Sequence, residues 1–233
     1  MGSDEHPVIL SQTLKAYGLP SYSKFAVACG QTAGFVMIGA GLFWYGLLSG
    51  KMTVDQALSA LAALHGLGAL NFAINSAPDL GLPAGGAFFH GILAFAVSYL
   101  MYNGGAGDFS TQDIAKYYGL FQVLLGAIGY LYPVELLEKH GMKGEQCSDL
   151  TSVEMMKLQL TTAMMSGILL MNSHSSLART IALAWIPNTL SCYIGMSAGS
   201  PKAMGMDSDV HLKVWFLIGA VFIHSALSAG VCF

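Results

Sequence analysis

The sequence predicts an all-α fold: a polytopic integral membrane bundle of about seven transmembrane helices, with the N-terminus inside and the C-terminus outside. Of its 233 residues, 54% are hydrophobic and only 10% are charged, whereas an average soluble domain carries about 25% charged residues. Ten basic and thirteen acidic side chains are too few to give a globule of this size a solvated surface. This composition excludes an ordinary cytosolic enzyme, a disordered tail protein and a nucleic-acid partner.

The few charges divide the chain into seven charge-free stretches. A helix needs roughly 20 apolar residues to cross a bilayer core of about 30 Å, and each stretch reaches or approaches that length. The stretches are residues 25–50, 56–78, 80–107, 117–134, 158–178, 180–201 and 214–233. We therefore expect a single transmembrane helical domain over residues 25–233, after a polar N-terminal segment over residues 1–24. The second stretch is rich in Ala, Gly and Asn, so its full crossing of the bilayer is left open.

Helix-start signals support these boundaries. In a capping box, the side chain of the residue before the helix accepts a hydrogen bond from the backbone amide three residues later. The side chain of that later residue in turn accepts a hydrogen bond from the backbone amide of the first. Three pairs have this spacing, before the second, fourth and fifth helices: Thr53 with Gln56, Ser110 with Asp113, and Thr151 with Glu154. Pro187 lies inside the sixth stretch, where we expect a kink that the neighbouring helices accommodate.

The Lys and Arg residues predict the orientation, since cytoplasmic loops of membrane proteins carry an excess of them. With seven spans, alternate connections face the same side. The N-terminal side then holds Lys15, Lys24, Lys139, Lys143, Lys157, Lys202 and Lys213. The opposite side holds Lys51, Lys116 and Arg179. This seven-to-three division predicts that the N-terminus is inside.

Glycine is abundant, at 28 residues, and four pairs have GxxxG spacing. Residues four apart share one helix face, so two glycines there let another backbone approach closely. The pairs are Gly30/Gly34, Gly46/Gly50, Gly81/Gly85 and Gly195/Gly199. The first and last lie well within predicted helices, and the third lies in a predicted turn. Together they predict helices that pack tightly with one another or with a partner subunit.

The interiors of the seven stretches lack ionised groups. A proton-coupled transporter, pump or ion channel usually places a carboxylate or a basic side chain at membrane depth, so these classes are disfavoured. Lys213 lies at the edge of the last stretch, which argues against a retinal Schiff base within that helix. The four cysteines form no CxxC pair, so we expect small buried residues and neither a metal site nor a catalytic site.

Three histidines are candidate cofactor ligands. His65 lies near the middle of the second stretch, His90 in the third and His224 in the last, each with small residues nearby. An imidazole beside small residues leaves room for a macrocycle, so a haem or a chlorophyll could be held there. The alternative, which we favour, is that each histidine forms an interhelical hydrogen bond.

Asn71 and Asn75 form a polar stripe on the same helix as His65. Their spacing places both amides on one helix face, where they could line a cavity for a small molecule or a lipid. Hydrogen bonds to neighbouring helices would satisfy the same amides, and we favour that structural role.

These observations favour an accessory or scaffold subunit of a larger membrane assembly, which acts through close helix packing and has no catalytic chemistry of its own. The expected partners are membrane lipids and either other membrane subunits or further copies of this chain. A first alternative is a binding or transport protein for a neutral or lipidic molecule, using His65, His90, Asn71 and Asn75. A second is a haem- or chlorophyll-binding subunit with His65 and His90 as axial ligands.

Overall fold

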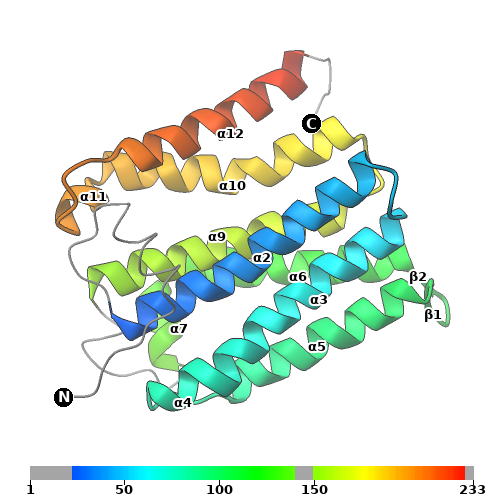
Figure 1. The fold of residues 1–233 in the computed structure, drawn as a ribbon, viewed down its shortest axis with the longest axis horizontal. Coiled ribbons are helices and arrows are strands. Elements are labelled where there is room, and N and C mark those ends of the chain that lie inside the picture. Colours follow the sequence, from blue (N-terminus) through cyan, green and yellow to red (C-terminus); the bar gives the residue numbers. More distant parts are fainter. Residues whose placement is uncertain (1–22, 140–148, 229–233) are drawn as a thin grey trace.

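The computed structural model describes residues 23–139 and 149–228, and this part of the chain is nearly all helical (Figure 1). Its long helices are α2 (Lys24–Leu48), α3 (Val54–Asn71), α5 (Gly85–Tyr102), α6 (Thr111–Leu131), α9 (Leu150–Asn172), α10 (Leu177–Ser197) and α12 (Val210–Ser228). Each overlaps one of the seven charge-free stretches. The shorter helices are η1 (Phe72–Ser76), α4 (Ala77–Asp79), α7 (Pro133–Lys139) and α11 (Ser200–Ala203). Strands β1 (Gly105–Ala106) and β2 (Phe109–Ser110) form a small antiparallel hairpin between α5 and α6.

Two of the predicted capping boxes are confirmed. The Thr53 side chain accepts a hydrogen bond from the Gln56 amide at 3.2 Å, and the Gln56 side chain accepts one from the Thr53 amide at 3.0 Å. Ser110 and Asp113 make the same reciprocal pair at the start of α6. Both boxes satisfy backbone donors that a helix start otherwise leaves without partners.

The third predicted box is wrong, because α9 begins earlier. The helix starts at Leu150, and the Asp149 side chain accepts a hydrogen bond from the Ser152 amide at 3.1 Å. Thr151 and Glu154 therefore lie inside the helix. An aspartate caps a helix at least as well as a threonine, and its negative charge also favours the N-terminal end of the helix dipole.

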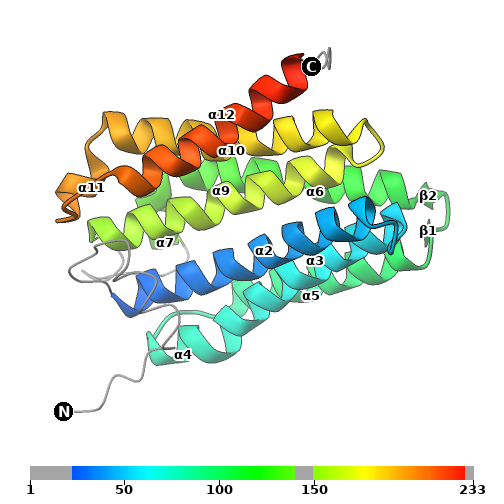
Figure 2. The same cartoon turned by 45° about the horizontal axis from the view of Figure 1, so that its top comes forward.

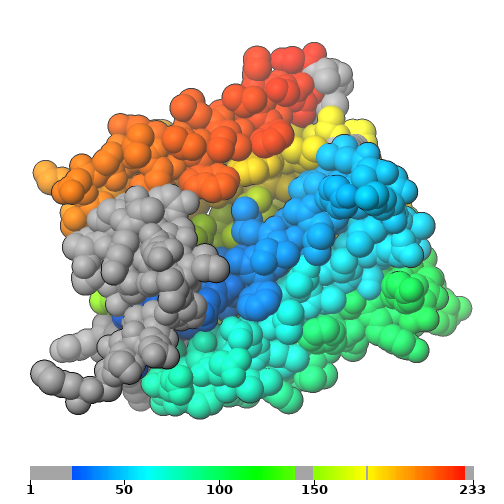
Figure 3. All heavy atoms as spheres, in the orientation of Figure 1, coloured from blue at the N-terminus to red at the C-terminus, as the bar shows by residue number. Residues whose placement is uncertain are grey.

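Five of the long helices form a ring. Helix α3 packs between α5 and α2, α9 packs between α2 and α6, and α5 contacts α6 to close the circle. Helix α10 packs on α9 outside the ring, and α12 packs on α10 (Figures 1 and 2). Figure 3 shows α12 as a ridge along the edge of the molecule farthest from α5. The helices lie roughly alongside one another, as in a transmembrane bundle.

Glycines allow the closest helix contacts, although at positions other than the predicted pairs. A Cβ atom added at Gly119 of α6 would lie 2.5 Å from the carbonyl oxygen of Gly167 on α9, and the reverse also holds. In contrast, Gly50 and Gly199 have positive φ angles of 66° and 70° and end their helices. A Cβ at Gly34 would meet nothing within 4 Å. Of the predicted pairs, Gly46 and Gly195 do have close neighbours, Met52 and Leu212, but the closest approach between two helix backbones is at Gly119 and Gly167.

The second predicted helix contains an irregular turn. Residues 54–79 are helical throughout, but Phe72–Ser76 adopt a π-helix between α3 and α4. A π-turn widens the helix by one residue and is often found at functional sites. This turn leads into α4, at the end of the ring opposite the β1–β2 hairpin (Figure 1).

In the described part of the chain, five helical segments are long and apolar enough to cross a membrane. They are Lys24–Leu48, Val54–Asp79, Gly85–Tyr102, Thr111–Leu131 and Val210–Ser228. Helices α9 and α10 are equally long but less apolar. The fold is consistent with a membrane protein of at least five apolar helices.

Candidate functional site

The ring of helices surrounds a partly open cavity of about 390 Å³. Its walls come from α2, α3, α5, α6 and α9, with contributions from η1 and α7. Most of the lining is apolar and includes Phe25, Val36, Phe72, Phe121, Leu125 and Leu160. A volume of this size falls in the range of small-molecule sites, about 300–1,000 Å³.

Three polar side chains from three helices meet at this cavity. The rings of His65 on α3 and His90 on α5 have centroids 5.0 Å apart. The Nε2 atom of His90 lies 3.2 Å from the side-chain nitrogen of Gln122 on α6. We call these residues the polar cluster. The structure thus brings together two of the three predicted histidines and adds a glutamine that was not predicted.

Glycines next to the two histidines explain how they come so close. His65 is followed by Gly66 and His90 by Gly91. A Cβ atom at Gly66 would lie 3.0 Å from the Gly91 carbonyl oxygen, so any larger residue would push α3 and α5 apart. The same two helices are joined elsewhere by hydrogen bonds between serines 59 and 98, in which each side chain donates to the other's carbonyl at 2.8–2.9 Å.

Two buried atoms of the polar cluster have no hydrogen-bond partner in the described part of the chain: Nδ1 of His65 and Oε1 of Gln122. Gln122 is fully buried, and His65 is 6% exposed. A buried polar atom without a partner costs about 1–3 kcal/mol. Most such atoms in native proteins bind a water or a ligand, so these two indicate where a polar group would bind.

The lining of the cavity is uncharged. Among the described residues that form it, none is Asp, Glu, Lys or Arg. A charged ligand would have no opposite charge to offset the cost of leaving water. The chemistry of the site is therefore hydrogen bonding to a neutral group beside apolar walls.

Comparison with known proteins assigns the chain to no family. No protein-family model matches the chain, and neither a curated protein nor a solved structure is significantly similar to it. The function is therefore argued from the geometry of the cavity.

The other predicted site residues lie elsewhere. His224 is exposed on α12, outside the ring, and its Nε2 atom lies 3.4 Å from the Ser228 hydroxyl. The Asn75 side chain donates a hydrogen bond to that of Asn71 at 2.8 Å. Neither asparagine lines the cavity. This bond joins two residues four apart along the chain, whereas the role that we favoured was hydrogen bonding to neighbouring helices.

The cofactor prediction rests on His65 and His90 alone. In the residues that the structure describes, no group of three or more His, Cys, Asp or Glu side chains could hold a metal ion. The two described cysteines, Cys29 and Cys192, are buried, while Cys147 and Cys232 lie outside the described residues. Axial ligation of a haem or chlorophyll by the two histidines stays a prediction.

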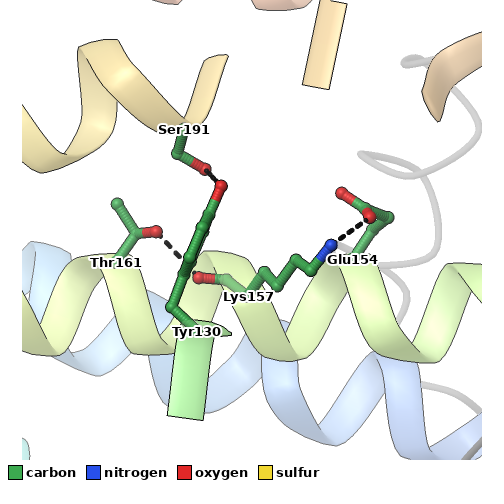
Figure 4. A network of polar contacts seen from close by, with 5 residues as sticks. All are labelled: Tyr130, Glu154, Lys157, Thr161 and Ser191. Atoms are coloured by element: carbon green, nitrogen blue, oxygen red, sulfur yellow. Dashed lines mark hydrogen bonds and ion pairs between the residues drawn. The ribbon is translucent and has the colours of Figure 1, made fainter. Parts of the chain in front are cut away.

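A second group of polar contacts joins α6, α9 and α10 (Figure 4). Lys157 forms an ion pair with Glu154 at 2.9 Å, and its ammonium lies 5.9 Å from the centre of the Tyr130 ring. The Tyr130 hydroxyl donates to Ser191 at 3.3 Å, and Thr161 donates to the Lys157 carbonyl at 2.8 Å. Because α9 starts before the predicted stretch, both charges lie within the helix. The pairing leaves this part of α9 without net charge.

Proposed function

We propose that this protein is a multi-pass membrane protein that binds a small, neutral and mainly apolar molecule in the cavity of the helix ring. One observation supports this above all: His65 and Gln122, which line a cavity with apolar, uncharged walls, each carry a buried polar atom without a partner. The bound molecule would place one hydrogen-bonding group at the polar cluster and its apolar part against the walls. Small-molecule sites commonly combine apolar walls with a few convergent polar groups.

We further propose that all seven long helices cross the membrane, with the N-terminus inside. The lower apolarity of α9 has a physical reason in its surroundings. Helix α9 contacts α2, α6 and α10, so much of its surface faces protein rather than lipid. Helix α10 lies between α9 and α12 and is shielded in the same way. Thr, Ser and paired charges are tolerated on such internal faces.

Mass spectrometry of the protein extracted in mild detergent tests the binding function. We expect a neutral molecule to co-purify with the wild type and to be depleted in Gln122→Leu. Loss of one hydrogen bond corresponds to about a tenfold loss of affinity. The control is Gln112→Leu, an exposed glutamine at the start of the same helix. Equal retention by both variants, or no bound molecule in any preparation, would contradict the proposal.

The accessory-subunit function is the second candidate, because α12 exposes a broad apolar face. Its side chains Val214, Leu217 and Val221 are 47–61% exposed, and the helix packs chiefly on α10. Lipid or a helix of another subunit would cover this face. Native mass spectrometry distinguishes the two: a stable complex supports a subunit function, whereas a monomer with a bound small molecule supports the binding function alone.

An absorption spectrum tests the haem or chlorophyll alternative. A protein that holds either group through His65 and His90 would be coloured as purified, and substitution of either histidine would remove the colour. A colourless preparation would contradict this alternative and leave the binding function standing.

A further inference from the structure

The contact between α5 and α6 is the least extensive helix–helix contact in the ring. Helix α5 packs chiefly on α3, and α6 packs chiefly on α9, so the two touch each other less extensively than either touches its main neighbour. Phe89 on α5 and Phe121 on α6 both line the cavity. Their side chains are also 68% and 41% exposed. The cavity therefore reaches the surface of the bundle between these two helices, at a gap that we call the α5–α6 gap.

This gap lies between the sides of two helices, from Phe89 near the start of α5 to Phe121 on α6. Phe121 is at the middle of α6, which runs from Thr111 to Leu131. In a helix that crosses the membrane, its middle lies at the level of the lipid chains. A molecule that passes through the α5–α6 gap would thus come from the apolar layer of the bilayer.

The free atoms of the polar cluster limit the chemistry of the ligand. The side-chain nitrogen of Gln122 faces His90, so its oxygen is the atom left without a partner. An amide oxygen accepts a hydrogen bond, so a ligand group at this oxygen would donate one. The Tyr118 hydroxyl, one turn earlier on α6, is also buried without a partner. A hydroxyl group donates to Gln122 and can also accept from the His65 ring nitrogen. A ketone, ester or ether lacks the donor, and a carboxylate or phosphate lacks a countercharge.

We infer that the ligand is a lipid alcohol that enters from the bilayer through the α5–α6 gap and places its hydroxyl between Gln122 and His65. This inference rests on the proposed binding function and names its ligand class and route. The apolar body of the alcohol lies against Phe25, Phe72 and Leu160, and any remaining length extends through the gap toward the lipid.

Photolabelling of the full chain in lipid nanodiscs tests the ligand class. The probe is a long-chain primary alcohol that carries a diazirine in its chain. We expect saturable labelling of peptides from α5 and α6, competed by hexadecan-1-ol but at least tenfold less well by 1-methoxyhexadecane or hexadecanoate. Gln122→Leu should weaken saturable labelling about tenfold, whereas Gln112→Leu should not. Each variant is compared only if it elutes and melts as a folded protein.

The pattern of failure separates the inference from the proposed function. If the ether or the carboxylate competes as well as the alcohol, the ligand class is wrong while binding in the cavity stands. Labelling that does not saturate and is unchanged by Gln122→Leu, together with no co-purifying molecule, contradicts the binding function itself.

The rate of labelling tests the route. Phe89→Ala widens the α5–α6 gap, so we expect a several-fold higher initial rate of labelling. Phe88→Ala is the matched control, because Phe88 is 48% exposed on the same helix but does not line the cavity. An equal change in both variants, or none in Phe89→Ala, would contradict access through the gap.

Discussion

At the scale of single residues, small side chains decide which polar groups meet. His65 and His90 approach because Gly66 and Gly91 bring α3 against α5. Both histidines could be singled out in the sequence, since each is a rare polar group in a charge-free stretch. Gln122 was not singled out, because its importance depends on which helix faces α5. Its only signal in the sequence is that it is a glutamine within an apolar stretch.

The contact between Gly119 and Gly167 should be intolerant of any added atom. Gly167→Ala would place its Cβ 2.5 Å from the Gly119 carbonyl oxygen, and backbone atoms cannot move aside cheaply. Overpacking of this kind costs about 1–3 kcal/mol. We expect Gly167→Ala to lower the thermal midpoint in detergent by several degrees.

Gly34→Ala is the control for that substitution. A Cβ at Gly34 meets nothing within 4 Å, and alanine favours a helix by up to about 1 kcal/mol over glycine. Its thermal midpoint should equal or exceed that of the wild type. Equal destabilisation by both variants would show that glycine packing does not hold α6 against α9.

At the scale of elements, α9 owes its polar composition to its central place. Its pair of Glu154 and Lys157 is half-buried, with side chains 19% and 26% exposed. Removal of one partner from such a pair leaves an uncompensated charge, whereas replacement of both by neutral residues is often harmless. The pair therefore tests whether α9 lies inside the bundle.

We expect Lys157→Met to lower the thermal midpoint, since it leaves the Glu154 carboxylate unpaired within the helix. The double variant, with Glu154→Gln added, should regain most of the loss. Thermal unfolding in the same detergent measures both. A double variant no more stable than the single one would show that water still solvates the Glu154 carboxylate.

Helix α12 packs extensively on α10, and the helices approach most closely at Gly219. A Cβ at Gly219 would overlap the Thr189 hydroxyl, and the Trp185 and Trp215 rings stack with centroids 6.1 Å apart. We expect Gly219→Leu to separate the helices, which would alter tryptophan fluorescence and expose α12 to protease. Ligand binding should persist, because α12 does not line the cavity. The exposed Leu217→Ala should change none of these readouts.

At the scale of the whole molecule, the charge pattern located all seven long helices but not their neighbours. A charge marks where a helix must leave an apolar layer, which is a local property of the chain. The ring is a property of many contacts, as the Gly119–Gly167 approach shows. The π-turn at Phe72–Ser76 and the cap at Asp149 likewise depend on surroundings that a single sequence does not display.

The count of seven spans can be tested with three exposed positions. Glu138→Cys, His174→Cys and Asp207→Cys mark the connections before α9, after α9 and after α10. In sealed vesicles, with the native cysteines replaced by alanine, we expect His174→Cys to react with an impermeant maleimide from one side and the other two from the opposite side. If all three react from the same side, α9 and α10 do not cross.

The position of α10 and α12 outside the ring bears on how the protein is made. The described residues that line the cavity run from Phe25 to Ala163, and the last two long helices add none. Since helices enter the membrane in the order of their synthesis, every wall of the binding site is present before α10 leaves the ribosome. Nascent chains that end after α9 should therefore already bind the proposed ligand.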